Sequence, residues 1–215
     1  MYKFIKAISL LTTLLLILSI TACTPGNQEA ILANEKLTEA KLENEKLKQV
    51  ISDMRLYVEI ANEIKKLEDF TDKINNVDNF MFNLAANVEA VDRDQSITNT
   101  FFDAAKFQID SLKEEKEIIY NETQSFIDTQ EKDYIESDID VSFLNNIIDK
   151  QNEAISGFQC AYELLYSYYY ENSNGSFTLY MSMRASSKEA AQVAEEMCKT
   201  EYERCMKLLK KQLAR

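Results

Sequence analysis

Residues 70–91, FTDKINNVDNFMFNLAANVEAV, carry the clearest structural pattern of the chain. Their large apolar side chains are spaced alternately four and three residues apart, which places them on one face of an α-helix. The segment contains no glycine or proline that would end a helix. We therefore expect an amphipathic helix that buries this face. The apolar positions are Phe70, Ile74, Val77, Met81, Leu84, Val88 and Val91.

The composition of the whole chain also favours helices. Its 215 residues include three glycines and one proline, and Pro25 and Gly26 stand side by side near the N-terminus. Helix breakers are therefore scarce over the remaining length. Hydrophobic residues make up 46% of the chain, which is enough to build a packed core. We predict an all-α fold, an antiparallel bundle of four to five long helices formed as a single domain by residues 29–215.

Three further helices follow residues 70–91. We expect the next one from Ile97 to Phe126, a connection at 128–141, a helix from Ser142 to Tyr170, a turn at 172–176 and a last helix to the C-terminus. Residues 177–185 alternate apolar and polar side chains, so the last helix begins either near Ser176 or at the capping-box sequence from Ser186. We favour helix throughout. The inward faces are predicted to contain Ile97, Phe101, Ala105, either Ile109 or Gln108, Leu112, Ile119 and Phe126, then Leu144, Ile147, Ile155, Phe158, Tyr162, Leu165 and Tyr169, then Ala191, Ala194, Cys198, Tyr202, Cys205, Leu209 and Leu213.

A weaker pattern covers residues 30–61. One position of a heptad repeat holds Ala30, Leu37, Asn44, Ile51 and Val58, and the other holds Ala33, Ala40, Leu47, Met54 and Ala61. This segment is predicted to be a long N-terminal helix, which either projects as a stalk and self-associates as a coiled coil or is a solvated helix whose second half joins the bundle. We favour the solvated helix because alanines form a weak seam.

The N-terminal segment has the parts of a secretory signal. Lys3 and Lys6 precede an apolar run that is too short to span a membrane. The run ends at residues 17–23, Ile-Leu-Ser-Ile-Thr-Ala-Cys, which resemble the lipobox of bacterial lipoproteins. The resemblance implies that residues 1–22 are a signal peptide, that Cys23 carries fatty acyl chains such as palmitate, and that residues 23–28 are a lipidated tether. The protein is then expected in the cell envelope on the extracytoplasmic side, at an outer membrane or a Gram-positive cell surface.

The net charge of the mature chain limits the kinds of partner that it is expected to bind. Removal of residues 1–22 takes away two lysines and no acid, which leaves 22 basic against 36 acidic residues and a net charge of −14. Such a surface is not expected to bind nucleic acid, because phosphate backbones require basic residues. The same negative charge is expected to repel anionic lipid headgroups. The acyl chains on Cys23 are therefore the expected membrane attachment.

Histidine is absent from the chain. This removes the commonest general base, the commonest metal ligand and every triad that depends on histidine. No pair of cysteines has the C-x-x-C spacing of a metal site. The sequence therefore favours a non-catalytic protein without a cofactor or a metal.

Residues 162–180 form a tyrosine-rich region. It includes Tyr162, Tyr166, Tyr169, Tyr180 and Met181 at its edge. Side chains of this kind can line a pocket for an apolar or cationic ligand. They are equally typical of a core whose hydroxyl groups reach the surface, and this is the reading that we favour.

Three cysteines, Cys160, Cys198 and Cys205, remain after lipidation of Cys23. If the connection between the last two helices covers residues 172–186, Cys160 lies opposite Cys198 and a disulfide is expected between them. If the connection covers only 172–176, Cys160 lies opposite residues near 187 and no bond forms. Buried thiols that act as small apolar groups are the other interpretation.

Two functions follow as hypotheses. The first is a membrane-anchored, non-catalytic helical bundle that binds a protein or another envelope component. The second is a bundle that binds or senses a small ligand through residues 162–180. An exposed apolar strip on the first helix would favour the first function, and a closed cavity lined by Tyr162, Tyr166, Tyr169 and Met181 would favour the second.

Overall fold

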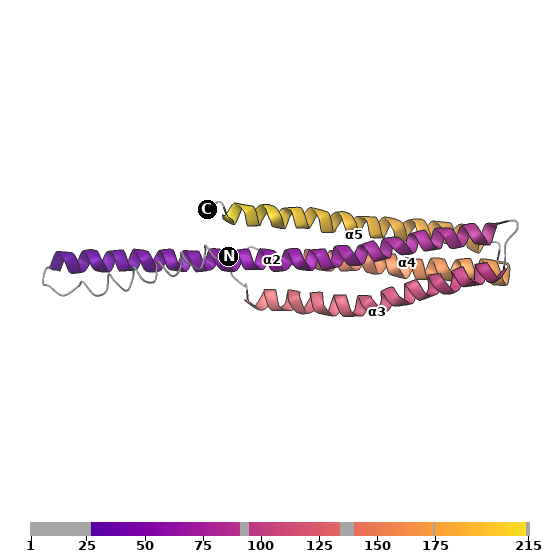
Figure 1. Ribbon diagram of the computed structural model, residues 1–215, viewed down its shortest axis with the longest axis horizontal. Helices are drawn as coiled ribbons and strands as arrows, with labels where there is room; N and C mark the ends of the chain where they lie inside the picture. Colours follow the sequence, from indigo (N-terminus) through magenta and orange to yellow (C-terminus); the bar gives the residue numbers. More distant parts are fainter. Residues whose placement is uncertain (1–26, 91–94, 134–139, 174, 214–215) are drawn as a thin grey trace. The chain divides into compact units, whose positions relative to one another are not determined.

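The computed structural model describes residues 27–90, 95–133, 140–173 and 175–213 (Figure 1). These residues form four helices: α2 (Asn27–Glu89), α3 (Gln95–Asp133), α4 (Phe143–Glu171) and α5 (Ser176–Leu213). No strand occurs within these ranges. The all-α prediction is confirmed. The signal peptide, Cys23 and most of the tether lie outside the described residues.

The chain divides into two units between Asp53 and Met54. The second unit contains the end of α2 together with α3, α4 and α5, and it forms an antiparallel bundle. Lys66 pairs with Glu122, and Lys73 pairs with Glu115, so α2 and α3 run in opposite directions. The α3–α4 pair is antiparallel because Tyr120 donates to the Ile148 carbonyl and Tyr170 donates to Asn99. The α4–α5 pair is antiparallel because Gly157 lies against Ser187 and the Tyr168 ring lies beside Phe177.

A parallel contact connects α2 with α4. Buried Gln151 of α4 donates from Nε2 to the Leu67 carbonyl at 2.7 Å and to Thr71 Oγ1 at 2.8 Å. Nearer the other end of the two helices, Tyr168 donates to Glu89 at 2.7 Å. The bundle therefore alternates up and down, with α2 and α4 parallel to each other.

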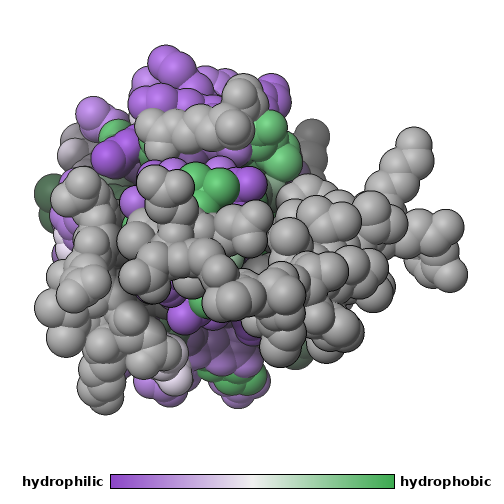
Figure 2. Space-filling model, turned by 90° about the vertical axis from the view of Figure 1, so that its left-hand side faces the viewer, coloured by the Kyte–Doolittle hydropathy of each residue, from purple (hydrophilic) through white to green (hydrophobic). Residues whose placement is uncertain are grey.

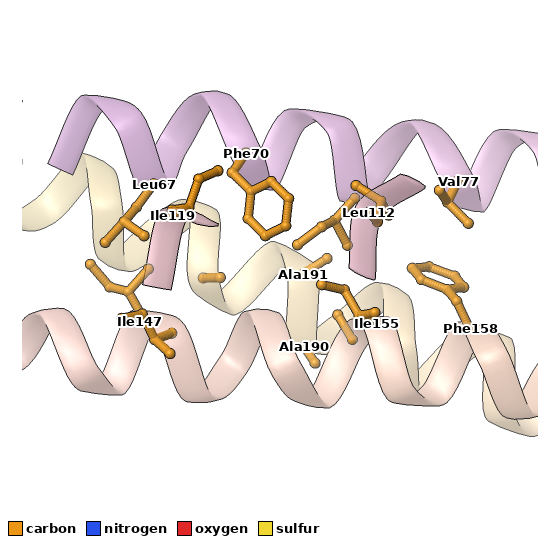
Figure 3. Packing of buried hydrophobic residues seen from close by; sticks show 14 of the residues in the cluster. Leu67, Phe70, Val77, Leu112, Ile119, Ile147, Ile155, Phe158, Ala190 and Ala191 are labelled. Carbon is orange, nitrogen blue, oxygen red and sulfur yellow. The ribbon is translucent and has the colours of Figure 1, made fainter. Parts of the chain in front are cut away.

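The apolar stripe of residues 70–91 is the centre of the core. Its members from Phe70 to Val88 are at most 1% exposed, and Val91 lies outside the described residues. Figure 3 shows side chains from all four helices packed together along this stripe. The labelled residues are Leu67, Phe70 and Val77 of α2, Leu112 and Ile119 of α3, Ile147, Ile155 and Phe158 of α4, and Ala190 and Ala191 of α5.

The inward face of α3 begins one residue later than predicted. Phe102 is 2% exposed and Thr98 is 1% exposed, whereas Ile97 is 51% exposed and Phe101 is only partly buried. The predicted residues Ala105, Leu112 and Ile119 are buried. The helix also extends to Asp133, so part of the predicted connection at 128–141 is helical.

The last two helices form a tight hairpin. Helix α4 ends at Glu171, and Asn172 adopts the left-handed conformation with φ 54° and ψ 34°, which is a common way to end a helix. Residues 177–185 belong to α5, so the prediction of helix throughout is confirmed. Toward its C-terminus two predicted core residues are wrong, because Tyr202 is 39% and Leu213 is 63% exposed.

The N-terminal part of α2 is continuous helix through residues 27–53. Its apolar side chains are exposed, with Leu37 at 42%, Leu47 at 49% and Ile51 at 42%. In the second unit the core of α2 begins at Leu56, which is 1% exposed. This exposure is expected both for a solvated helix whose second half joins the bundle and for a stalk that pairs with a second copy.

Candidate functional site

The tyrosine-rich region forms an aromatic cluster between α3 and α4. Buried Phe102 is its centre, and the rings of Tyr162, Tyr166, Tyr169 and Tyr170 lie with their centroids 5.4 to 5.9 Å from it. Their spacing along α4 places all four near the side that faces α3. The Tyr170 hydroxyl donates to Asn99 Oδ1 at 2.5 Å.

The aromatic cluster is filled by its own rings. The Tyr166 and Tyr170 centroids are 4.4 Å apart, and those of Tyr169 and Tyr170 are 4.7 Å apart. Burial raises the pKa of Tyr162 to about 12, with smaller contributions from Tyr166 and Asp103. Tyr166 and Tyr170 remain 41% and 39% exposed. The arrangement therefore resembles a packed aromatic edge of the core, with two rings at the surface.

The structure brings together only three of the five predicted pocket residues. Tyr162, Tyr166 and Tyr169 belong to the aromatic cluster. Tyr180 is fully buried elsewhere, where its hydroxyl donates to the Met81 carbonyl of α2 at 2.7 Å and its ring lies 5.7 Å from Phe177. Met181 is 45% exposed.

The possible disulfide between Cys160 and Cys198 is absent, since both cysteines and Cys205 carry free thiols. The close approach of Gly157 to Ser187 sets the register of α4 and α5. Cys160 therefore faces residues near Arg184. Cys198 lies fourteen residues further along α5, about 21 Å away along the helix. The short connection at 172–176 is the alternative that the structure supports.

The buried thiols are directed toward α2. Cys205 donates from Sγ to the Tyr57 carbonyl at 2.9 Å, and Cys198 lies beside Thr71. Burial raises the pKa of Cys198 to about 12 and also raises that of Cys205. Reactive cysteines need a thiolate at neutral pH, so these two groups act as structural side chains.

An ion cluster between α2 and α5 was not predicted from the sequence. The Asp78 carboxylate is 4% exposed and pairs with Arg184 Nε at 2.6 Å and with Lys188 Nζ at 3.2 Å. The Arg184 guanidinium also lies over the Phe82 ring, 5.0 Å from its centroid. The sequence did hold a signal for a buried acid, because Asp78 stands four residues after Ile74 and three before Met81 on the core side of the stripe, but none for its partners on α5.

A shallow groove lies between α2 and α3. Its volume is about 440 Å³, and the buried side chains of Phe70 and Ile119 form part of its lining. Lys66 and Lys73 contribute to the rim, but each is paired with a glutamate of α3. Lys66 and Lys73 on this rim therefore already form ion pairs between the two helices.

The N-terminal part of α2 carries an exposed apolar strip, which is the feature expected if the protein binds a partner through its first helix. We define the α2 strip as Ala33, Leu37, Ala40, Asn44, Leu47 and Ile51. Every member is exposed except Ala40, which is half-buried. In the part of the surface that is coloured in Figure 2, hydrophilic residues predominate and hydrophobic residues form small separate areas.

The described residues contain neither a metal-binding cluster nor a helix that could span a membrane. No group of three or more acidic or cysteine side chains in them is arranged to hold a metal ion. None of the described helices is long and apolar enough to cross a bilayer. Comparison of the chain with protein-family models, curated proteins and solved structures gives no match.

Proposed function

We propose that this protein is a lipid-anchored, non-catalytic helical bundle that binds a helical protein partner at the cell envelope. Acyl chains on Cys23 hold it to the membrane, and the α2 strip is its binding surface. The main support for this proposal is that Leu37, Leu47 and Ile51 are exposed and stand at the core positions of a heptad repeat. Apolar residues in such an arrangement favour a partner helix.

The binding of a small ligand by residues 162–180 has less support. It requires a cavity lined by Tyr162, Tyr166, Tyr169 and Met181. The first three side chains instead pack around Phe102, and exposed Met181 follows Tyr180 on α5, which is buried against α2. The rings of the aromatic cluster thus fill the space that a ligand would need.

The anchor is tested by replacing the lipidated residue. Cells that express the full chain are grown with a labelled fatty acid, and the chain is isolated from the membrane fraction. We expect label and membrane association in the parent chain and loss of both in Cys23→Ser. Equal labelling of the two chains would contradict the anchor.

The binding surface is tested with a photo-crosslinking amino acid at one of two positions of the full chain. Leu47 belongs to the α2 strip, whereas Leu42 is 57% exposed but lies on another face of the helix. We expect a covalent protein adduct from position 47 and little from position 42. Absence of an adduct at 47, or equal adducts at both positions, would contradict binding through the α2 strip.

A further inference from the structure

We propose that the occupant of the α2 strip is a second copy of this chain, aligned in parallel and in register as a two-stranded coiled coil. This inference rests on the proposed function and makes it specific. The strip provides positions a and d of a heptad: Leu37, Asn44 and Ile51 at position a, and Ala33, Ala40 and Leu47 at position d.

Asn44 is the observation that selects the occupant. It is exposed and stands at position a, between the apolar residues Leu37 and Ile51. In a parallel pair in register, Asn44 meets Asn44 of the other copy, and the two amides satisfy each other. A single asparagine at position a specifies register and favours two strands, at some cost in stability. In an antiparallel pair Asn44 would face an apolar d position.

The charges beside the α2 strip are compatible with this pairing. In a parallel pair a residue at position g faces the residue five further along the other copy, at position e. Glu43 then faces Lys48, which is an attractive contact between copies. Lys36 faces Lys41, which is repulsive. The flanks therefore contribute little net energy, and the orientation depends mainly on Asn44.

The anchor compensates for a seam that contains two alanines. Acyl chains on Cys23 would confine all copies to one leaflet with their N-termini on the same side, which is the orientation that a parallel pair needs. Confinement raises the effective concentration of a partner and so strengthens an association that is weak in dilute solution. We therefore expect the pair in membranes more than in dilute solution.

The test is disulfide cross-linking of the full chain in membranes. Position 37 faces its own copy across the seam of a parallel pair in register, within the roughly 7 Å Cα separation that a disulfide tolerates. Residue 42 lies on the outer side of such a pair. After mild oxidation with copper phenanthroline, we expect at least a fivefold greater yield of disulfide-linked dimer from Leu37→Cys than from Leu42→Cys. The parent chain measures the background from Cys160, Cys198 and Cys205.

Equal yields from the two cysteine variants, or no dimer above background from Leu37→Cys, would overturn the proposal. A second variant separates pairing from register. Asn44→Leu removes the buried amides, so we expect stronger association in detergent by sedimentation and a population larger than a dimer. Weaker association of Asn44→Leu would show that residue 44 is not in the seam. The helical circular dichroism and thermal unfolding of each variant serve as folding controls.

The failures of the two proposals are distinguishable. If Cys23 carries no label but Leu37→Cys still gives the dimer, the proposed anchor is wrong and the pairing stands. If photo-crosslinking at position 47 captures a different protein and Leu37→Cys gives no dimer, the strip binds a partner and the second copy is excluded.

Discussion

Gly157 of α4 lies directly against Ser187 of α5. A Cβ atom at position 157 would be 2.1 Å from Ser187 Oγ and 3.2 Å from Ser187 Cβ. Ser187 is itself 2% exposed and donates to the Met183 carbonyl at 2.7 Å. The absence of a side chain at 157 thus allows the two helices to approach closely, and the contact fixes the register of the final hairpin.

Gly157→Ala is therefore expected to destabilise the bundle by about 1–3 kcal/mol, because an added methyl group overlaps a buried side chain. The better helix propensity of alanine, about 1 kcal/mol, reduces the loss. Chemical denaturation measures the effect. Gly175→Ala is the matched control, since a Cβ there has no atom within 4 Å. An unchanged free energy of unfolding for Gly157→Ala would contradict the close approach.

The second prediction concerns the ion cluster of Asp78, Arg184 and Lys188. Asp78→Asn removes the negative charge and leaves the two cations without it, so we expect a loss of about 3 kcal/mol in the free energy of unfolding. The exposed pair of Lys106 and Asp110 provides the control, because Asp110→Asn should cost less than about 1 kcal/mol.

A double variant tests the cause of that loss. Asp78→Leu combined with Arg184→Met replaces the ion pair by apolar groups, and such replacements are often neutral or stabilising. We expect this variant to recover most of the stability lost in Asp78→Asn. If the double variant is as unstable as Asp78→Asn, packing rather than the unpaired charge explains the loss.

The sequence was sufficient to predict the centre of the fold. The large apolar side chains of residues 70–88 recur at intervals of four and three over several turns, so the sequence alone identifies the buried face of this helix. The face of α3 was harder to identify because Phe101 and Phe102 are adjacent and both are apolar. Only packing distinguishes them, and Phe102 is the one placed beneath the four tyrosines of α4.

The candidate site was less accessible to prediction. Tyr162, Tyr166 and Tyr169 are neighbours on one helix, and local spacing is enough to group them. Tyr180 and Met181 are on another helix, and their place depends on where the hairpin turns. The ion cluster required the register of α2 against α5, which no local pattern specifies.

The third prediction concerns the buried Tyr180 hydroxyl. Tyr180→Phe removes a hydrogen bond to the Met81 carbonyl and leaves that oxygen without this donor, so we expect a loss of about 1–2 kcal/mol. Tyr170→Phe should cost less because the Tyr170 ring is 39% exposed. Urea denaturation of both variants provides the comparison, and equal losses would contradict the greater importance of the buried bond.

The fourth prediction is a loss of stability at alkaline pH. Burial raises the pKa of Tyr162 and Tyr180 from 10.0 to about 12, and that of Cys198 from 9.0 to about 12. Between these values the unfolded chain releases protons that the native chain retains. The free energy of unfolding therefore includes the full contribution of these protonated groups below about pH 9, and this contribution decreases as pH rises toward 12. Denaturant midpoints at successive pH values measure the decrease, which Cys198→Ala should make smaller. A midpoint that is constant from pH 9 to 12 would contradict it.

The last prediction separates the three thiols by their reactivity. Cys198 is 0% and Cys205 is 5% exposed, whereas Cys160 is only partly buried. Burial raises the pKa of the first two thiols, so at pH 8 they hold little of the thiolate that attacks a disulfide reagent. In Cys23→Ser, which removes the lipidated position, we expect one thiol to react rapidly with such a reagent in the native state. After denaturation without reductant, all three thiols should react. Cys160→Ser should abolish the rapid phase, and a total of one thiol after denaturation would show that two of the three cysteines form a disulfide.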